Sequence, residues 1–277
     1  MPELPEVEVT RRALTPYVES QWVEAVIVRQ PRLRWPVPAL LPSLMAGHRV
    51  ERLCRRGKYL LWQFAHGTLI SHLGMSGAWR VWPRRRPVPP PEAHDHCDVI
   101  FTDACLRLTD PRRFGALLWH DAQAGDIGSH PLLAGLGIEP FDLGFTGEWL
   151  YQHTRARAAS IKQVLLAGDI VVGVGNIYAS ESLFRAGINP KRSARRLGRA
   201  SCETLAVAVR EVLTEAIAAG GSTLRDFVGT DGSDGYFMLD ARVYGRAGEP
   251  CRVCATPIVR VFQGQRATFY CRNCQKR

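Results

Sequence analysis

The chain has 277 residues, with 36 Lys and Arg residues against 26 Asp and Glu residues and a formal net charge of +10. This length predicts about two domains, and 46% hydrophobic with 22% charged residues excludes wholesale disorder. No apolar run approaches the roughly 18–20 residues that span a bilayer. The acidic, proline-bearing N-terminus does not resemble a signal peptide, so we expect a cytosolic protein.

The positive charge is unevenly distributed. Residues 241–277 contain eight Lys and Arg residues and one acid, Glu249, so this tail carries +7 of the +10. The excess favours an anionic polymer as partner, and the alternative is a basic surface that only keeps the protein soluble. Most of the positively charged residues are arginines, and the few lysines are Lys58, Lys162, Lys191 and Lys276.

The N-terminal half predicts one helix followed by antiparallel strands. Residues 5–18 favour a helix, because Pro5 suits its first position, Glu6 and Glu8 suit its positive end, and Leu14 and Val18 lie four apart. Short apolar or alternating segments then recur between Gly and Pro residues at the spacing of a β-sandwich. These segments are 22–28, 48–53, 58–64, 68–73, 77–82, 97–102, 106–109 and 115–120.

The C-terminal half is predicted to be helical. Residues 84–91 form a proline-rich loop, and residues 121–149 form the connection between domains. One helix is expected from Asn176 to Gly187, and another over 201–219 with Ser201 as N-cap.

The fold class is therefore α+β: an antiparallel β-sandwich with a flanking helix, then a helical domain and a small ribbon. We expect the domains at 1–133, 134–242 (with 134–149 as linker) and 243–277.

Four cysteines near the C-terminus have the spacing of a metal site. They form two C-x₂-C pairs separated by sixteen residues, enough for a β-hairpin. Four thiolates make a closed tetrahedral site for one structural Zn²⁺, whose binding replaces hydrophobic burial in so short a ribbon. Arg266 falls near the tip of the hairpin, where it suits a phosphate contact. The expected ligands are Cys251, Cys254, Cys271 and Cys274.

The other cysteines and a histidine-rich segment do not indicate a second metal. Cys54, Cys97, Cys105 and Cys202 occur singly and are expected to be buried thiols. Residues 94–97 read HDHC, but neighbours on an extended segment point to alternating faces and do not converge on one ion. We therefore expect a structural role for this segment.

The start of the chain offers a candidate nucleophile. If Met1 is removed, Pro2 has a free secondary amine beside the carboxylate of Glu3. An α-amino pKa near 7.7–8.0, against roughly 10.4 for lysine, leaves far more neutral amine at pH 7. Such an amine can attack a sugar carbon and form an iminium, while Glu3 moves protons. Met-Pro starts are common, so the alternative is an ordinary terminus.

Six motifs in chain order resemble those of bacterial formamidopyrimidine-DNA glycosylases. They are PELPEVE at 2–8, RGKYLL at 56–61, HLGMSG at 72–77, TDPRRFG at 109–115, GVGNIYASE at 173–181 and the four-cysteine ribbon. The resemblance covers essentially the whole chain. It implies a monomeric, bifunctional DNA-repair enzyme with a helix–two-turn–helix, acting on double-stranded DNA. Such an enzyme excises 8-oxoguanine opposite cytosine and formamidopyrimidines, and then cuts the abasic site by β,δ-elimination.

The resemblance also implies residue roles. Pro2 attacks C1′, Glu3 is the acid and base, and Lys58 donates a proton and contacts phosphate. After the base is extruded, Met75 fills the stack, Phe114 wedges the opposite strand and Arg112 hydrogen-bonds the orphaned cytosine. The residues expected to contact phosphate in the C-terminal half are Lys162, Asn176 and Arg266. From its place five residues after Asn176, Glu181 either helps to order this region or is an ordinary surface carboxylate.

One departure concerns the damaged-base contact. Some members of the family carry lysine where Arg225 stands. The planar guanidinium of arginine and the compact ammonium of lysine differ in hydrogen-bonding geometry, so the contact of Arg225 with the damaged base is left open. The Gly- and Asp-rich loop at 230–237 is expected to cover the extruded base through backbone groups.

Gly173-x-Gly175 does not indicate a dinucleotide site, because the strand–turn–helix unit and the third glycine are missing.

Two other functions fit parts of the sequence. An endonuclease VIII-like enzyme would prefer oxidised pyrimidines, but that branch usually has glycine where Leu4 stands. A catalytically silent zinc-ribbon protein would bind damaged DNA without cutting it, and the intact Pro2, Glu3 and Lys58 argue against it.

Overall fold

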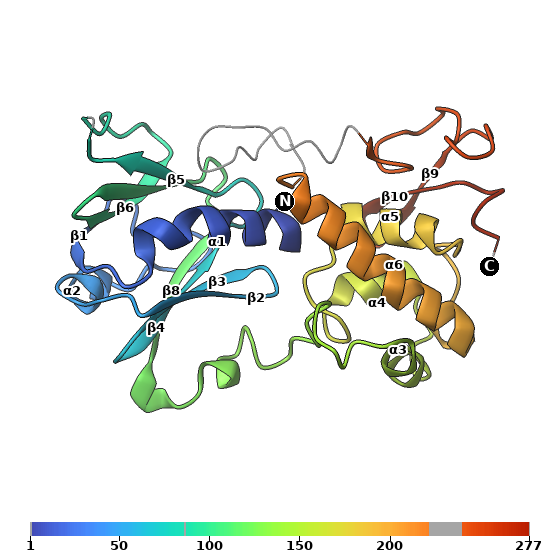
Figure 1. Ribbon diagram of the computed structural model, residues 1–277, viewed down its shortest axis with the longest axis horizontal. Helices are drawn as coiled ribbons and strands as arrows, with labels where there is room; N and C mark the ends of the chain where they lie inside the picture. Colours follow the sequence, from blue (N-terminus) through green and yellow to red (C-terminus); the bar gives the residue numbers. More distant parts are fainter. Residues whose placement is uncertain (1, 86, 222–239, 277) are drawn as a thin grey trace. The chain divides into compact units, whose positions relative to one another are not determined.

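The computed structural model describes residues 2–85, 87–221 and 240–276. The chain forms two compact units (Figure 1). The first consists of Met1–Ala134 and Ala219–Tyr236, and the second of Gly135–Ala218 and Phe237–Arg277. The predicted fold class is confirmed, since strands dominate the first unit and helices the second.

The first unit contains two antiparallel sheets of four strands each. One sheet has the order β1 (Val23–Val28), β6 (Asp95–Phe101), β7 (Ala104–Thr109) and β5 (Ala78–Pro83). The other has the order β2 (Arg52–Arg56), β3 (Tyr59–Phe64), β4 (Gly67–His72) and β8 (Ala116–Asp121). Every predicted strand overlaps an observed one. The segment 48–53 is displaced, because residues 48 and 49 bridge to the start of β1 and only its end enters β2.

Aromatic side chains fill the space between the two sheets. Trp62 of β3 and Trp79 of β5 are both fully buried, with ring centroids 5.3 Å apart. Trp62 also stacks on Phe101 of β6 at 6.5 Å, and the indole N–H of Trp79 donates to the Ser71 hydroxyl of β4 at 3.0 Å. Each contact joins one sheet to the other. The helix α1 (Leu4–Val18) contributes Val7, Leu14 and Val18 to the same core.

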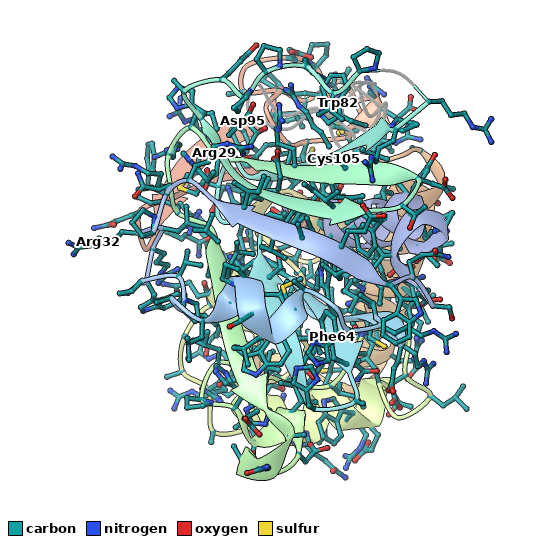
Figure 2. The ribbon with its side chains drawn as sticks, turned by 90° about the vertical axis from the view of Figure 1, so that its left-hand side faces the viewer. Arg29, Arg32, Phe64, Trp82, Asp95 and Cys105 are labelled. Atoms are coloured by element: carbon teal, nitrogen blue, oxygen red, sulfur yellow. The ribbon has the colours of Figure 1, made fainter. Side chains whose placement is uncertain are left out.

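The buried carboxylate of Asp98 on the first sheet is paired with two arginines. In Figure 2, Asp95 and Cys105 lie on this sheet, Arg29 directly follows its strand β1, and Phe64 lies on the other sheet. Asp98 accepts two hydrogen bonds from the buried Arg107, at 2.8 and 2.9 Å, and one from Arg29 at 2.6 Å. These contacts satisfy carboxylates that would otherwise be buried without partners.

The second unit contains four α-helices and a hairpin among its described residues. They are α3 (Gly147–Thr154), α4 (Ile161–Ala167), α5 (Asn176–Arg185), α6 (Arg199–Ala218), β9 (Val259–Gln263) and β10 (Arg266–Tyr270). Single-turn 3₁₀ segments lie at Ala122–Ala124 and Ile127–Ser129 in the first unit and at Ala194–Arg196 in the second. Within the part of the chain that the structure describes, no helix has the length and apolar character needed to span a membrane.

Two expectations about helices need correction. Ser201 is not an N-cap, because α6 begins at Arg199 and Ser201 lies inside its first turn. Ser201 has the right chemistry for a cap, but Gly198 already accepts the first helical hydrogen bond, from the N–H of Cys202. The helices α2 (Leu41–Met45), α3 and α4 were not predicted, because these short segments lack a clear helical period.

The isolated cysteines are as predicted in three of four cases. Cys97, Cys105 and Cys202 are buried, and Cys54 is half-buried. Burial raises the pKa of Cys97 to about 12 and that of Cys105 to about 11. These thiols are therefore protonated and unreactive at neutral pH.

Candidate functional site

The N-terminal candidates lie at the start of α1. Pro2 is buried, and Glu3 is only 2% exposed. Glu3 and Glu6 form a capping box, in which the backbone N–H of Glu3 donates to the Glu6 carboxylate at 2.8 Å. The helix dipole favours a carboxylate here, so Glu3 is held as a fixed acceptor beside Pro2.

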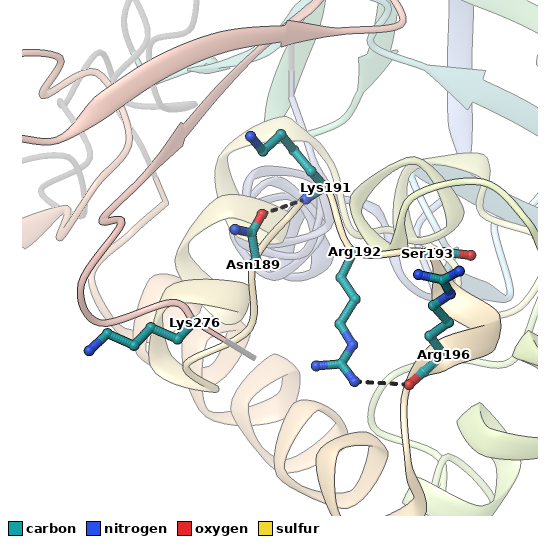
Figure 3. A pocket seen from close by; sticks show the side chains of 6 residues that line it. All are labelled: Asn189, Lys191, Arg192, Ser193, Arg196 and Lys276. Carbon is teal, nitrogen blue, oxygen red and sulfur yellow. Dashed lines mark hydrogen bonds between the residues drawn. The ribbon is translucent and has the colours of Figure 1, made fainter.

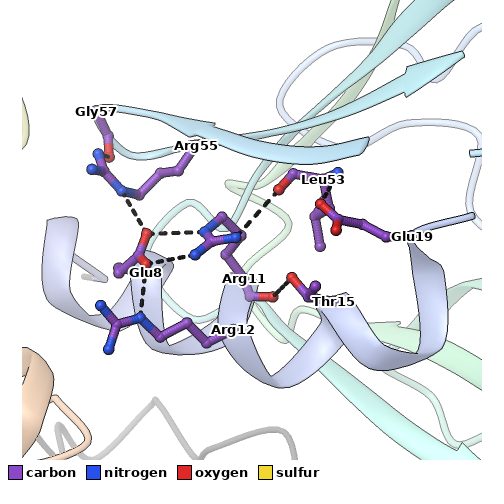
Figure 4. A network of polar contacts seen from close by, with 8 residues as sticks. All are labelled: Glu8, Arg11, Arg12, Thr15, Glu19, Leu53, Arg55 and Gly57. Carbon is purple, nitrogen blue, oxygen red and sulfur yellow. Dashed lines mark hydrogen bonds and ion pairs between the residues drawn. The ribbon is translucent and has the colours of Figure 1, made fainter. Parts of the chain in front are cut away.

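A charged network ties the start of α1 to the turn between β2 and β3 (Figure 4). Glu8 accepts from Arg11 at 2.8 Å, from Arg12 at 2.9 Å and from Arg55 of β2 at 3.1 Å. Arg55 also donates to the carbonyl of Gly57, in that turn, at 3.0 Å. Burial opposes ionisation of Glu8, but the hydrogen bonds from Arg11 and Arg12 and the nearby positive charges outweigh it and lower the pKa to about 2. No local pattern in the sequence indicated this network.

Lys58 occupies the second position of that two-residue turn. Gly57 precedes it with φ 56°, the positive value that primed hairpin turns require, and Arg56 pairs with Tyr59 across the turn. Tyr59 in turn pairs with His72 at the end of β4, with ring centroids 4.8 Å apart. The hairpin therefore holds Lys58 close to His72.

His72 is a neutral hydrogen-bonding group. Burial, followed by the positive charges of Lys58 and Arg34, lowers the pKa of His72 to about 4. The backbone N–H of Gly74 donates to Nδ1 at 3.0 Å, which leaves the ring proton on Nε2. His72 is thus an uncharged residue with a hydrogen-bond donor at Nε2, and no sequence signal marked it as part of the site.

The three predicted wedge residues lie on two adjacent connections. Met75 is on the β4–β5 connection and is half-buried. Arg112 and Phe114 are on the β7–β8 connection, where the Arg112 guanidinium lies over the Phe114 ring at 5.0 Å. Phe114 is 44% exposed. It is therefore a surface aromatic residue rather than a core residue, as an intercalating wedge requires.

In the second unit, Asn176 begins α5. Its amide nitrogen donates to the Tyr244 hydroxyl at 3.4 Å, and its buried amide oxygen has no hydrogen-bond partner among the described residues. Glu181, on the same helix, accepts backbone hydrogen bonds from Arg242 and Tyr244 at 2.8 Å and from Val243 at 3.0 Å. Glu181 is thus a buried carboxylate that orders the segment contacting Asn176, as expected.

The four predicted metal ligands converge. Their sulfur atoms all lie within 4.8 Å of one another, and the closer pairs are 3.4, 3.5 and 3.9 Å apart. A tetrahedral Zn²⁺ with Zn–S bonds of about 2.3 Å requires sulfur separations of about 3.8 Å. The donor set therefore fits one structural zinc ion with no open coordination position. The cluster is formed by Cys251, Cys254, Cys271 and Cys274.

Arg266 and Lys162 differ in their placement. Arg266 is exposed and follows the hairpin turn of Gly264 and Gln265, whose φ values are 52° and 63°. Lys162 is fully buried, and its ammonium donates to the Ala267 carbonyl at 3.0 Å and to the Thr268 hydroxyl at 2.9 Å. The Lys162 side chain thus joins α4 to the zinc hairpin, and its contact with phosphate stays a prediction.

A basic concavity on the second unit was not predicted. It has a volume of about 550 Å³ and follows α5 (Figure 3). No acidic residue is among those that line it in the described structure. Lys191 also lies over the buried Tyr270 ring of β10 at 5.3 Å, so the concavity adjoins the zinc hairpin. The lining residues are Asn189, Lys191, Arg192, Ser193, Arg196 and Lys276.

The remaining candidates are a tentative base contact, a loop and a histidine. Arg225 and residues 230–237 lie outside the described residues. His96, from the segment that was not expected to bind metal, is buried, and its Nε2 donates to the Asp110 carbonyl at 2.8 Å. Among described residues, only the four-cysteine cluster has metal-binding geometry.

Three family models match nearly the whole chain in order. The formamidopyrimidine-DNA glycosylase N-terminal domain matches residues 1–117, its H2TH domain matches 136–228, and the zinc finger found in FPG and IleRS matches 248–277. The chain belongs to the formamidopyrimidine-DNA glycosylase family. Curated relatives with this name include those of Herminiimonas arsenicoxydans, 59% identical over 276 residues, and Bordetella petrii, 60% identical over 278 residues. Both alignments cover all of each chain.

Solved structures of the family have the same fold. The MutM (Fpg) protein of Thermus thermophilus superposes with a TM-score of 0.87 at 39% identity, covering 99% of each chain. A mutant Lactococcus lactis Fpg in complex with Fapy-dG-containing DNA gives 0.89 at 32% identity, covering 100% of each chain. The Lactococcus lactis enzyme bound to abasic-site DNA gives 0.86 at 30% identity, covering 99% of this chain and 100% of that one.

The Glu8 network should make the protein sensitive to acid. The folded pKa of Glu8, about 2, lies below its ordinary value of 4.5, so its contribution to stability is complete above pH 4.5 and is lost as the pH falls toward 2. Urea unfolding of Glu8→Gln at pH 7 should show a loss of at most about 3 kcal/mol and a weaker dependence on acid. The exposed Glu24→Gln is the control. An unchanged acid dependence in Glu8→Gln would contradict this assignment.

Zinc removal should unfold the ribbon and leave the sandwich intact. Cys254→Ser removes one ligand, and structural zinc contributes on the order of 10 kcal/mol to such small domains. We expect zinc content, measured by native mass spectrometry, to fall from one ion toward none, with little change in the tryptophan near-UV dichroism of the sandwich. Cys54→Ser should retain the ion. Full zinc retention in Cys254→Ser would refute the four-thiolate assignment.

Proposed function

We propose that this protein removes oxidised purines from double-stranded DNA, chiefly 8-oxoguanine opposite cytosine and formamidopyrimidines, and then cuts the strand by β,δ-elimination. One observation carries the proposal. The helix α1, which Pro2 and Glu3 directly precede, is joined through Glu8, Arg55 and Gly57 to the Lys58 turn, and this turn adjoins His72 and the wedge connections. The nucleophile, the proton donor and the base-displacing residues therefore share one framework.

The chemistry follows from these side chains. After removal of Met1, the neutral Pro2 amine attacks C1′ of the damaged nucleotide, and the bond from C1′ to the base breaks with a proton supplied to the leaving base. The Pro2 nitrogen then loses its proton, and the sugar ring opens at the C1′–O4′ bond with a proton taken up by O4′, which leaves an iminium between Pro2 and C1′. This iminium acidifies C2′, and loss of a C2′ proton expels the 3′ phosphate. A second elimination expels the 5′ phosphate, and water then releases the sugar fragment. Glu3 moves protons at the sugar, and Lys58 neutralises and protonates the leaving phosphate.

Base extrusion explains the exposed wedge. A base buried in a duplex is out of reach of Pro2, so it has to leave the stack. Met75 then occupies the vacated space, Phe114 inserts into the opposite strand, and Arg112 donates to the unpaired cytosine. An apolar side chain lowers the cost of the gap, which is why an exposed phenylalanine is useful here.

The second unit supplies backbone contacts. Asn176 at the N-terminus of α5 and Arg266 at the hairpin tip suit phosphates, and the zinc ion would keep that hairpin rigid. The basic concavity adds further positive charge to the same unit. We place the protein in the bacterial cytoplasm, on nucleoid DNA, as a monomer.

Borohydride capture tests the nucleophile. Reduction during reaction with an 8-oxoguanine duplex should fix the iminium as a covalent protein–DNA adduct, and peptide mapping should place it on Pro2. Acetylation of the terminal amine should reduce trapping at least about hundredfold, because an amide nitrogen is not nucleophilic.

Two controls sharpen this experiment. Lys58→Gln should still trap a pre-formed abasic site through Pro2, which excludes lysine as the attacking amine. A thymine glycol duplex tests the oxidised-pyrimidine alternative. Full trapping after acetylation would eliminate Pro2, and binding without any strand cleavage would leave only a DNA-binding protein.

Salt dependence tests the basic concavity as a phosphate-binding surface. Each neutralised phosphate releases counterions, and the slope of log K against log salt changes by about 0.9 per contact. The double substitution Lys191→Gln/Arg196→Gln should therefore reduce the magnitude of this slope by about 2 for binding to a long undamaged duplex. The equal charge change in Arg32→Gln/Arg52→Gln, at exposed residues of the first unit, is the control. Equal effects of both pairs would mean that only net charge matters.

A further inference from the structure

The two wedge connections are placed side by side by the strand register. The β4–β5 and β7–β8 connections both cross from one sheet of the sandwich to the other. At one end His72 pairs with Ala116, and at the other Ala78 pairs with Thr109. Each connection is therefore fixed at both ends to its neighbour, and the residues between those ends face each other over five or six positions.

A single buried carboxylate joins the two connections. Asp110 is 0% exposed. Its Oδ1 accepts from the Ser76 hydroxyl at 2.7 Å and from the backbone N–H of Arg112 at 3.3 Å, and its Oδ2 accepts from the backbone N–H of Gly115 at 2.8 Å. The Ser76 oxygen itself accepts from the Arg112 N–H at 3.2 Å. The backbone on which Arg112 and Phe114 are carried is thus bonded to the residue that follows Met75.

The main chain of Asp110 is fixed as well. Its N–H donates to the His94 carbonyl at 3.0 Å, and its carbonyl accepts from His96 Nε2 at 2.8 Å and from the Arg113 N–H at 3.1 Å. Arg113 has φ 54°, in the left-handed region that residues with a side chain seldom adopt. These hydrogen bonds hold the backbone in a tight turn directly before Phe114.

At Gly74 and Gly115 the main chains of the two connections are too close together to admit a side chain. A Cβ atom on Gly74, whose φ is 63°, would lie 2.3 Å from the Phe114 carbonyl carbon and 2.4 Å from the Gly115 nitrogen. A Cβ atom on Gly115 would lie 2.9 Å from the His72 carbonyl oxygen. The main chains on either side of Met75 and Phe114 therefore pack directly on each other.

We propose that Asp110, acting through Ser76, is a positioning residue that makes Met75, Arg112 and Phe114 enter DNA as one rigid unit. This inference rests on the proposed function. A charged acceptor with three donors holds the two connections in one arrangement before DNA binds, so ordering them costs little when the base leaves the stack. Asp110 does not touch DNA, and its effect should appear in the extrusion step and in the choice of the opposite base.

The test separates extrusion from later chemistry. In Asp110→Asn, an amide NH₂ replaces one carboxylate oxygen, so a hydrogen-bond donor faces the N–H of Arg112 or of Gly115. In Ser76→Ala, the hydroxyl that links the two connections is lost. Single-turnover excision of 8-oxoguanine opposite cytosine should slow by about tenfold or more in both variants. Cleavage of a pre-formed abasic site, which has no base to unstack, should slow less than about threefold. The preference for cytosine over adenine opposite the lesion should fall.

A matched control excludes a general loss of stability. Asp98→Asn removes another buried carboxylate of the same sandwich, one that binds Arg107 and Arg29 and touches neither connection. It should leave the ratio of the two rates and the opposite-base preference unchanged. Fluorescence of 2-aminopurine beside a tetrahydrofuran site provides an independent readout, and its rise on binding should be smaller in Ser76→Ala and Asp110→Asn than in the unaltered protein or Asp98→Asn.

The outcomes distinguish the two proposals. If the unaltered protein neither excises 8-oxoguanine nor cuts abasic DNA, the proposed function fails. If it does both and Ser76→Ala matches it in rate ratio, opposite-base preference and fluorescence, only the positioning role is overturned. A proportional fall of both rates in both variants would also overturn it. Ser76→Ala removes a single side-chain oxygen, so it remains informative if Asp110→Asn does not fold.

Discussion

The contact of Trp62 with Trp79 and Phe101 requires the two sheets to meet in one arrangement, and the site depends on that arrangement. Once these rings are buried between the sheets, the strand registers are fixed, and the connections that cross between sheets have set end points. A shift of one residue in either sheet would turn buried positions outward and separate Met75 from Phe114. The core thus serves the site by fixing the relative positions of short loops.

Part of this organisation could be read from the sequence, since some signals are local. The Cys spacing fixes a metal site because ligand geometry is encoded over a few residues, and alternating apolar segments indicated the strands. The roles of Pro2, Met75 and Phe114 came instead from family motifs, because an isolated phenylalanine or methionine is indistinguishable from a core residue by pattern. The motifs gave no sign of the partners that Lys162 has in the fold, because Ala267 and Thr268 are more than a hundred residues away and left no local signal.

Long-range polar contacts were also missed for this reason. Glu8 is an ordinary first-turn acid in the sequence, and only the fold shows Arg55 opposite it. Glu181 was expected to order its surroundings, but the three backbone donors at 242–244 come from a segment sixty residues later. In both cases a buried carboxylate joins two segments that carry functional residues. Polar groups of this kind specify a unique arrangement, whereas the apolar core alone would tolerate several.

The placement of the cysteines determines which part of the protein is sensitive to oxidative stress, the condition in which oxidised bases accumulate in DNA. Cys97 and Cys105 are sequestered in the sandwich and stay protonated well above neutral pH, so peroxide, which attacks thiolates, finds little to react with there. The ribbon is the opposite case, because its four sulfurs have to be deprotonated to hold zinc and two of them are only half-buried. Damage by oxidants should therefore begin at the zinc hairpin that carries Arg266, while the buried thiols of the sandwich stay intact.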